Sequence, residues 1–257
     1  MILVNTGYVL ETVSIPDSQY YGLTVGDLAM PFFLFIIGVT IAYSFSNRLK
    51  TGRGLRSESH GKEDLGKEYK HTLLVHTTLR SIVLFILGIL LDSFPYYNIN
   101  LGTLRITGPL QRIAICYLIA SLAYLYLKPR YRIVLALVIP ILYSLSGNLA
   151  YRIDVLVFGI NHLLIYSVGT PDPEGLLSTL AASSLVLIGC LVGEYLLQND
   201  VLHNTLDKIV KLILVASLLI SVGAVWNIWQ PTSKVLWTSS FNFLVAGISI
   251  LVLLFFK

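Results

Sequence analysis

The sequence predicts an all-α fold: a polytopic helical membrane protein with about seven transmembrane helices. Of its 257 residues, 55% are hydrophobic and only 12% are charged, whereas soluble domains carry about 25% charged residues. The mean hydropathy is +0.76. The apolar stretches approach the roughly 20 residues that a helix needs to cross a bilayer, and they are too long for outer-membrane strands of about 10 residues.

The predicted spans are apolar runs separated by polar or charged segments. They are Leu28 to Ser46, Leu73 to Leu91, Pro109 to Leu127, Tyr131 to Gly147, Glu174 to Leu197, Ile209 to Trp229 and Leu236 to Phe256. The stretch Met1 to Leu10 has no basic leader, which argues against a cleaved signal, and we interpret it as the tail of a shortened helix. We expect residues 1–257 to form a single transmembrane domain.

The basic residues predict the orientation of the chain. Segment 47–72 is polar, rich in Gly and Ser and more basic than acidic, so we predict a flexible cytoplasmic loop there. Basic residues also crowd two later turns, at Lys128 to Arg132 and at Lys208 to Lys211. The positive-inside rule then places Asp27 outside and the C-terminus in the cytoplasm, in a multi-pass protein of the plasma membrane. The net charge of +4 follows this topology, so we expect membrane lipid rather than nucleic acid as a partner.

Two loops on the predicted outer side are long, 92–108 and 148–173. Long loops between rigid elements often carry function. Three spans enter the membrane from this side, near Thr24, Thr107 and Asp172, so the positive ends of their helix dipoles share one face. We therefore look for the functional site on the outer side.

Asp27 has two interpretations. Thr24-x-x-Asp27 has the spacing of a capping box, in which each side chain satisfies a backbone amide of the other residue. By that interpretation Asp27 only starts a helix. A carboxylate at the membrane boundary is nevertheless costly unless it is paired or lines water, which leaves a catalytic or substrate-orienting role open.

The segment from Arg105 to Arg112 places a cation where a helix disfavours one. Arg112 lies in the first turn of its span, next to Gln111, and the positive end of the dipole repels its charge. A nearby anion is implied. It is either an internal carboxylate, from Asp27, Asp92 or Glu174, or an anionic group of a ligand.

Asp172-Pro173-Glu174-Gly175 is typical of a helix start, with Asp172 at the N-cap and proline at the first helical position. Glu174 is also a second outer carboxylate near the two arginines, and such clusters perturb one another's proton affinities. His162 is either a hydrogen-bonding loop residue or a base.

Arg80 lies about seven residues into its span from the inner side. Its side chain either reaches back to the lipid headgroups or binds phosphate from the cytosol. The sequence contains no metal-ligand spacing, phosphate-binding loop or Gly-x-Ser-x-Gly turn, and we expect no metal cofactor.

Taken together, several pieces resemble the transmembrane acyltransferase family of heparan-alpha-glucosaminide N-acetyltransferase. They are Gly22-Leu23-Thr24-Val25-x-Asp27-Leu28 with Pro31-Phe32-Phe33, Arg80-Ser81 before Gly88, Arg105-Ile106-x-Gly108-x-Leu110-Gln111-Arg112, Ile153-Asp154 with Gly159 and His162, Asp172-Pro173-Glu174-Gly175, and Leu236-Trp237. They follow one another along nearly the whole chain. By this resemblance the chain is a bacterial or archaeal relative that is shortened at both ends.

The resemblance implies transfer of an acetyl group from cytosolic acetyl-CoA to an amino sugar, or a similar small acceptor, across the membrane. The family pairs an asparagine with a histidine. Asn5 matches the asparagine, whereas Asp17 stands at the histidine position. An exposed aspartate, with a pKa near 4, is a weaker base than histidine unless burial raises that pKa.

The leading hypothesis is an integral-membrane N- or O-acetyltransferase. In it Asn5 polarises the acyl carbonyl, and Asp17 or Asp27 accepts the proton. The substrate-binding residues are Arg105, Gln111, Arg112, His162, Asp172, Glu174 and Trp237, and Arg80 binds the donor. The alternative is a non-catalytic membrane protein that keeps the scaffold to bind or transport a small ligand. The sequence is compatible with assembly into a homo-oligomer, and it leaves open the acceptor, the acyl chain and the oligomeric state.

Overall fold

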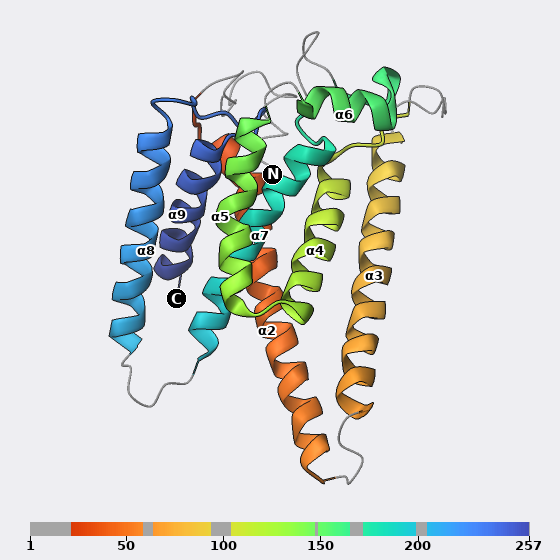
Figure 1. Cartoon of the computed structure of the whole chain (residues 1–257), viewed down its shortest axis with the longest axis vertical. Coiled ribbons are helices and arrows are strands. Elements are labelled where there is room, and N and C mark those ends of the chain that lie inside the picture. The colour runs from red at the N-terminus through yellow and green to blue at the C-terminus, as the bar shows by residue number, and fades with distance from the viewer. Residues whose placement is uncertain are drawn as a thin grey trace.

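The structure, a computed structural model, describes residues 22–58, 64–93, 104–146, 149–164, 172–198 and 205–256. In these ranges every regular element is a helix. They are η1 (Gly26–Leu28), α2 (Ala29–Glu58), α3 (Asp64–Ser93), α4 (Pro109–Tyr126), α5 (Pro129–Leu145), α6 (Leu149–Phe158), η3 (Ile160–His162), α7 (Leu176–Leu197), α8 (Thr205–Trp226) and α9 (Ser239–Phe255). The long helices run along one axis, and α6 lies across one end of the bundle (Figure 1). We call this the α6 end.

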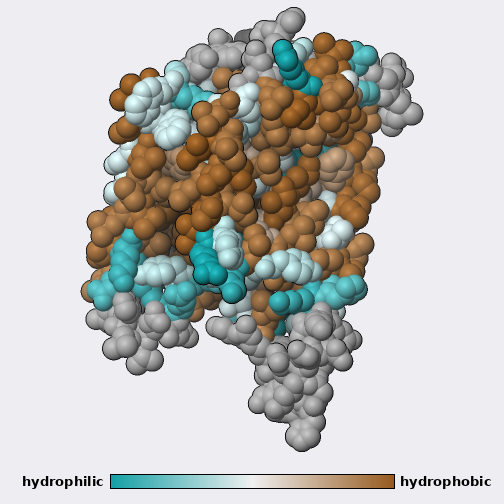
Figure 2. Space-filling model, viewed as in Figure 1, coloured by the Kyte–Doolittle hydropathy of each residue, from teal (hydrophilic) through white to brown (hydrophobic). Residues whose placement is uncertain are grey.

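The predicted fold class is confirmed, since each of the seven predicted spans coincides with a helix. Within the described ranges, five helices are long and apolar enough to cross a membrane: α2, α3, α4, α7 and α8. Helices α5 and α9 have 17 residues each. If α5 and α6 form one broken span, bent by 92°, the number rises to six. Figure 2 shows a broad apolar band across the middle of one face, with hydrophilic side chains gathered below it.

Helix α7 is the central helix of the bundle. Its apolar stretch is 78% buried by protein, against 22% for α3 and for α8, which lie at the outside. Small residues line it, including Ala181, Ala182, Ser183 and Ser184, all of them buried. Small side chains let neighbouring backbones approach, which is how helices gain packing energy in a membrane, where lipid is as apolar as leucine. The polar residues at the α6 end therefore rest on a tightly packed core.

The closest helix contact joins α2 to α7. A side chain added at Gly189 of α7 would meet the carbonyl oxygen of Phe35 in α2. The large buried side chains Leu34 and Phe35 of α2 and Leu185 and Leu187 of α7 belong to the same apolar core. Glycine is therefore needed here for space rather than for backbone freedom.

Two loop predictions are corrected. Segment 47–72 was predicted to be a flexible loop, but α2 continues to Glu58 and α3 begins at Asp64. The polar residues of this segment include good helix formers, Lys, Arg and Glu, which can extend an apolar helix into water. The outer loop 148–173 also contains a regular element, because α6 occupies Leu149–Phe158. Its run of apolar residues around a single buried carboxylate, Asp154, can cover the end of the bundle.

Candidate functional site

Arg105 ties two carboxylates together at the α6 end. Its Nη2 lies 2.6 Å from Glu174 Oε2 and 3.4 Å from Asp172 Oδ1. Asp172 is fully buried, and its other oxygen accepts hydrogen bonds from the Thr107 hydroxyl and from the Leu164 amide, both at 2.7 Å. Arg105 thus forms internal ion pairs with both carboxylates, and these pairs join the segment that leads into α4 to the segment that leads into α7.

The segment from Asp172 to Gly175 is a turn and not the first turn of α7. The Gly175 amide donates to the Asp172 carbonyl at 2.9 Å, and the Glu174 amide donates to Asp172 Oδ1 at 2.8 Å. Asp at the first position, Pro at the second and Gly at the fourth are the residues that a type I β-turn favours. The predicted N-cap role of Asp172 is therefore wrong, and α7 begins at Leu176 with Gly175 as its N-cap.

A carboxylate from α6 caps α7 instead. Asp154 Oδ1 accepts a hydrogen bond of 2.9 Å from the Leu176 amide, which satisfies one of the free donors of the first turn. Its second oxygen, Oδ2, is buried and has no hydrogen-bond partner. A side chain added at Gly175 would collide with this carboxylate. Glycine at the N-cap position is what makes room for the cap.

Opposing effects act on the pKa of the Asp154 carboxyl group. Burial raises the pKa of its carboxyl group from 3.8 to about 6, and the charge of Asp172 adds to the rise. The Leu176 amide and the positive charge of Arg112 oppose it. The carboxyl group therefore titrates in the mildly acidic range, where a group can both accept and release a proton.

Arg112 is a buried cation, with only 2% of its surface exposed. Its Nη2 donates to the Ser178 hydroxyl at 2.9 Å, and its guanidinium lies 4.2 Å from the ring centre of Trp237. No carboxylate of the described ranges forms an ion pair with it, and its Nε has no hydrogen-bond partner. The internal carboxylate predicted for Arg112 is therefore not found in these ranges.

The reason is that each proposed carboxylate is engaged elsewhere. Asp27 pairs with Lys234 at 3.3 Å, and Glu174 pairs with Arg105. Asp92 accepts a hydrogen bond of 3.1 Å from Gln111 Nε2. The three acids thus bind other donors, and Nε of Arg112 is left without a hydrogen-bond partner.

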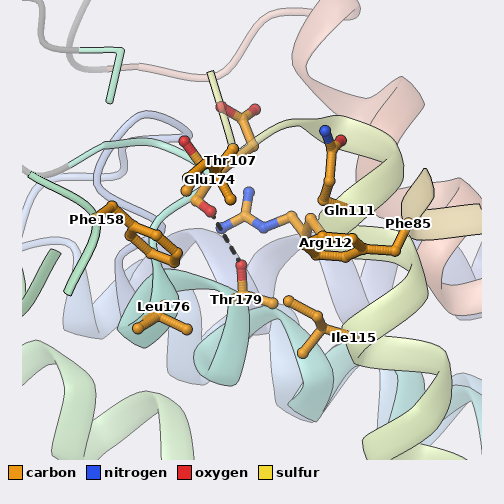
Figure 3. A pocket seen from close by; sticks show the side chains of 10 residues that line it. Phe85, Thr107, Gln111, Arg112, Ile115, Phe158, Glu174, Leu176 and Thr179 are labelled. Atoms are coloured by element: carbon orange, nitrogen blue, oxygen red, sulfur yellow. Dashed lines mark hydrogen bonds between the residues drawn. The ribbon is translucent and has the colours of Figure 1, made fainter. Parts of the chain in front are cut away.

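A small cavity lies beside Arg112. Its volume is about 20 Å³, and Arg112, Thr107, Gln111 and Glu174 contribute polar groups to its wall. The guanidinium crosses the centre of this cavity, between Glu174 and Thr107 on one side and Thr179 on the other (Figure 3). A space of this size holds about one water-sized group. Three of the seven predicted substrate-binding residues, Gln111, Arg112 and Glu174, line it.

Trp237 holds Arg112 from the other side. It is a non-glycine residue with a φ of 47°, in the left-handed region, and it is 1% exposed. Its Nε1 donates to Asn242 Oδ1 at 3.3 Å, and its ring packs edge-on against Phe241. A strained backbone costs about 1–3 kcal/mol and persists where the surroundings impose it, often at functional sites. The strained backbone of Trp237 thus lies where its ring packs against the guanidinium of Arg112.

His162 and Asp27 have structural partners. His162 Nδ1 donates to the Leu104 carbonyl at 2.6 Å, which agrees with the loop interpretation. Asp27 Oδ2 accepts hydrogen bonds from the Thr24 amide and hydroxyl, at 2.9 and 2.7 Å. The half of the capping box in which the carboxylate accepts from the Thr24 amide is thus present. The other half differs, because the Thr24 hydroxyl donates to the carboxylate instead of accepting from a backbone amide.

Arg80 lies apart from the cluster, in an apolar groove between α2, α3 and α4. The groove has a volume of about 610 Å³ and is lined by Phe33, Ile37, Val83, Leu110 and Tyr117 among others. Gly88 of α3 faces Gln111 of α4, so Arg80 lies eight residues, or about 12 Å, further along α3 from that level. Arg80 is exposed in the groove.

Two residues of the cluster, Asp154 and Ser178, were absent from the site predicted from the sequence. Asp154 stands alone as an acid in the apolar run of α6, and this isolation, together with the Ile153-Asp154 piece of the resemblance, was the available signal. Ser178 had none, because a serine in an apolar helix is ordinary. Asn5 and Asp17, the two residues of the predicted catalytic pair, lie outside the described residues.

Comparison with known proteins gives one consistent likeness. No known family profile matches the chain. Over 115 residues, 44% of its length, the chain is 30% identical to heparan-alpha-glucosaminide N-acetyltransferase of Mus musculus and 31% identical to that of Homo sapiens. It covers 15% of the length of each of these enzymes. The chain is a multi-pass helical membrane protein whose relationship to this N-acetyltransferase is distant at most.

Proposed function

We propose that this chain is an integral-membrane acyltransferase that moves an acetyl group from acetyl-CoA to an amino sugar or a similar small acceptor. The observation that carries the proposal is the likeness to a membrane N-acetyltransferase over 115 residues. Geometry adds to it, because Arg105, Arg112 and Glu174 lie together at the α6 end of an otherwise apolar bundle. In this proposal the α6 end faces outward across the plasma membrane, and the C-terminus is cytoplasmic.

The groove beside Arg80 is the site that we assign to the donor. Its apolar walls suit the extended pantetheine arm, and the guanidinium of Arg80 suits a phosphate group. Its volume of about 610 Å³ falls within the range of about 300–1,000 Å³ usual for ligand pockets. Arg80 forms no ion pair with a residue in the described ranges, so its charge is available to a ligand.

The acceptor site is the cluster at the α6 end. Arg105, Asp172 and Glu174 form its framework, and Gln111, Arg112, His162 and Trp237 complete it. Asn5 polarises the acyl carbonyl, and Asp17 or Asp27 accepts the proton of the acceptor. Asp27 is the weaker candidate of the two acids, since it is fully buried and paired with Lys234.

The test uses the full chain purified in detergent or nanodiscs with isotopically labelled acetyl-CoA and glucosamine. Acetylated sugar should form, and acetyl-CoA should raise the melting temperature. Arg80→Gln should weaken donor binding at least tenfold, whereas Arg130→Gln, which removes an exposed cation in the first turn of α5, should not. No transfer and no thermal shift would contradict the proposal.

A second function is favoured by Asp17, which stands where the resemblance expects histidine. In it the protein binds or transports a small anionic or sugar ligand without catalysis. Asp17→His separates the two: a gain of transfer by this variant shows that the donor site assembles and that the aspartate limits the chemistry. An unchanged, folded variant that binds ligand without transfer supports the second function.

A further inference from the structure

One wall of the cavity beside Arg112 belongs to α6. Phe158, the last residue of that helix, lies beside Leu176 of α7 at the edge of the cavity (Figure 3). The volume of about 20 Å³ admits one water-sized group, so no substrate enters this space as it stands. Arg112 is 2% exposed, and its unsatisfied Nε is buried. For a ligand to reach this arginine, part of the wall must move.

Helix α6 is the part of the wall that is held most loosely. Only Ala150 and Asp154 of its ten residues are buried, and it packs chiefly on α7. Leu156 and Val157 on its outer side are 85% and 56% exposed. The other helices of the wall, α3, α4 and α7, are long members of the bundle. An element that buries few side chains opens at a much lower free energy than the whole fold.

Gly159 provides a hinge at the end of α6. Its φ of 77° lies in the left-handed region, which a glycine adopts without the steric cost of a side chain. The chain beyond it is anchored to the segment that leads into α4. His162 Nδ1 donates to the Leu104 carbonyl, and the Ile106 amide donates to the His162 carbonyl at 3.3 Å. Helix α6 can therefore turn about Gly159 against a fixed segment.

Asp154 holds α6 down on α7. Its hydrogen bond of 2.9 Å from the Leu176 amide is the one polar contact between these two helices among the described residues. Asp154 Oδ2 is buried without a partner, which opposes the closed position. One hydrogen bond and a small apolar contact thus keep α6 over the first turn of α7.

We propose that α6 is a lid over Arg112 and the first turn of α7, which turns about Gly159, is latched by Asp154 and lifts to admit a small ligand from the α6 end. Lifting frees the Leu176 amide and withdraws Phe158 from the guanidinium. Two hydrogen-bond donors, the Leu176 amide and Arg112, then become available to the oxygen atoms of one ligand. The inference deepens the proposed function, on which the role of that ligand as the acceptor rests.

The experiment measures how fast a water-soluble maleimide reaches a cysteine in the cavity wall. Thr179→Cys places the thiol there, at a position that is 1% exposed. The matched control is Ser240→Cys, in the first turn of α9, where the exposed fraction is 0%. Both variants are made in the full chain in nanodiscs, with the two native cysteines replaced by alanine. Thr179→Cys should react at least tenfold faster than Ser240→Cys, because lifting of α6 exposes the first position and not the second.

A steric variant opens the lid deliberately. A side chain added at Gly175 would collide with the Asp154 carboxylate, whereas the φ of −62° at Gly175 suits alanine. Gly175→Ala should therefore raise the reaction rate of Thr179→Cys at least tenfold. Gly223→Ala, which meets Leu244 between α8 and α9, should leave that rate unchanged. Equal effects of the two glycine variants would overturn the proposal, and so would equal reaction rates at the two cysteine positions, a comparison that stands even if Gly175→Ala does not fold.

A reversible disulfide tests what the lid admits. A Cβ at Gly175 would lie 2.6 Å from Asp154 Cγ, close enough for a disulfide between Asp154→Cys and Gly175→Cys. The oxidised double variant should transfer acetyl groups at least tenfold more slowly than the same variant after reduction. Equal transfer in the two forms would overturn the proposal. Rapid labelling of Thr179→Cys without any transfer by wild type would refute only the proposed function, and transfer without such labelling would refute only the lid.

Discussion

Arg105 and Arg112 are seven residues apart, yet their surroundings give them different tasks. Arg105 is partly exposed and paired with two acids, so its charge is compensated within the protein. Arg112 is buried, contacts a hydroxyl and an aromatic ring, and keeps an unsatisfied Nε. The same side chain is therefore a structural tie in one place and a buried cation with an unsatisfied donor in the other.

The raised pKa of Asp154 predicts a pH-dependent stability. The folded state holds the proton more tightly than the unfolded chain, so the contribution of Asp154 to stability is full below about pH 4 and is lost as pH rises through about 6. Asparagine can still accept from the Leu176 amide. Asp154→Asn should therefore melt a few degrees higher than wild type at pH 7.5, a difference of up to about 3 kcal/mol.

The measurement is the melting temperature in detergent across this pH range. The difference between variant and wild type should vanish near pH 4. A constant difference at all pH values would mean that the carboxyl group titrates normally and that only the cap was altered.

Among the elements, α7 is the one on which the others pack, because most of its side chains are buried in the core. Its first turn also borders the cavity. Gly189 lets α2 approach α7. By helix propensity alone, Gly189→Ala should stabilise α7 by about 1 kcal/mol. The added methyl would meet the Phe35 carbonyl oxygen, so we expect the opposite sign, a loss of about 1–3 kcal/mol. Thermal unfolding decides between the two, and a higher melting temperature would contradict the close packing.

How much the sequence could predict also differs by element. The apolar runs predicted the seven long helices of the described ranges, because span length and hydropathy are local properties. The start of α7 was missed, since Asp172-Pro173-Glu174-Gly175 suits a turn as well as a helix, and the deciding cap comes from Asp154 in a distant segment. The partners of Arg112 were missed for a similar reason. Which acid pairs with which base depends on tertiary packing, and in this case on Lys234 and Gln111.

The whole molecule carries buried charge at both ends of its apolar bundle. Opposite the α6 end, Arg132 of α5 is 3% exposed, pairs with Glu194 of α7 at 2.8 Å and lies 4.6 Å from the ring centre of Tyr124 in α4. This contact joins three helices. The bundle is thus held by packing in its middle and by polar contacts at its two ends.

Removing one member of this pair should cost more than removing both. Glu194→Gln leaves the buried guanidinium without its anion, for which we expect a loss of up to about 3 kcal/mol, limited because Glu194 is 27% exposed. Adding Arg132→Met should restore part of the loss. A double-mutant cycle of melting temperatures measures the coupling, and simple additivity would show that the two residues act independently.

The cap that Asp154 places on α7 also bears on how the chain folds. The two partners are 22 residues apart, so the first turn of α7 is completed only after α6 has docked across the end of the bundle, and the chain must close a loop to bring them together. Helices with local contacts form faster than such closures. The cap therefore couples the ordering of the first turn of α7 to that of α6, and we expect local opening of α6 to release the start of α7 with it.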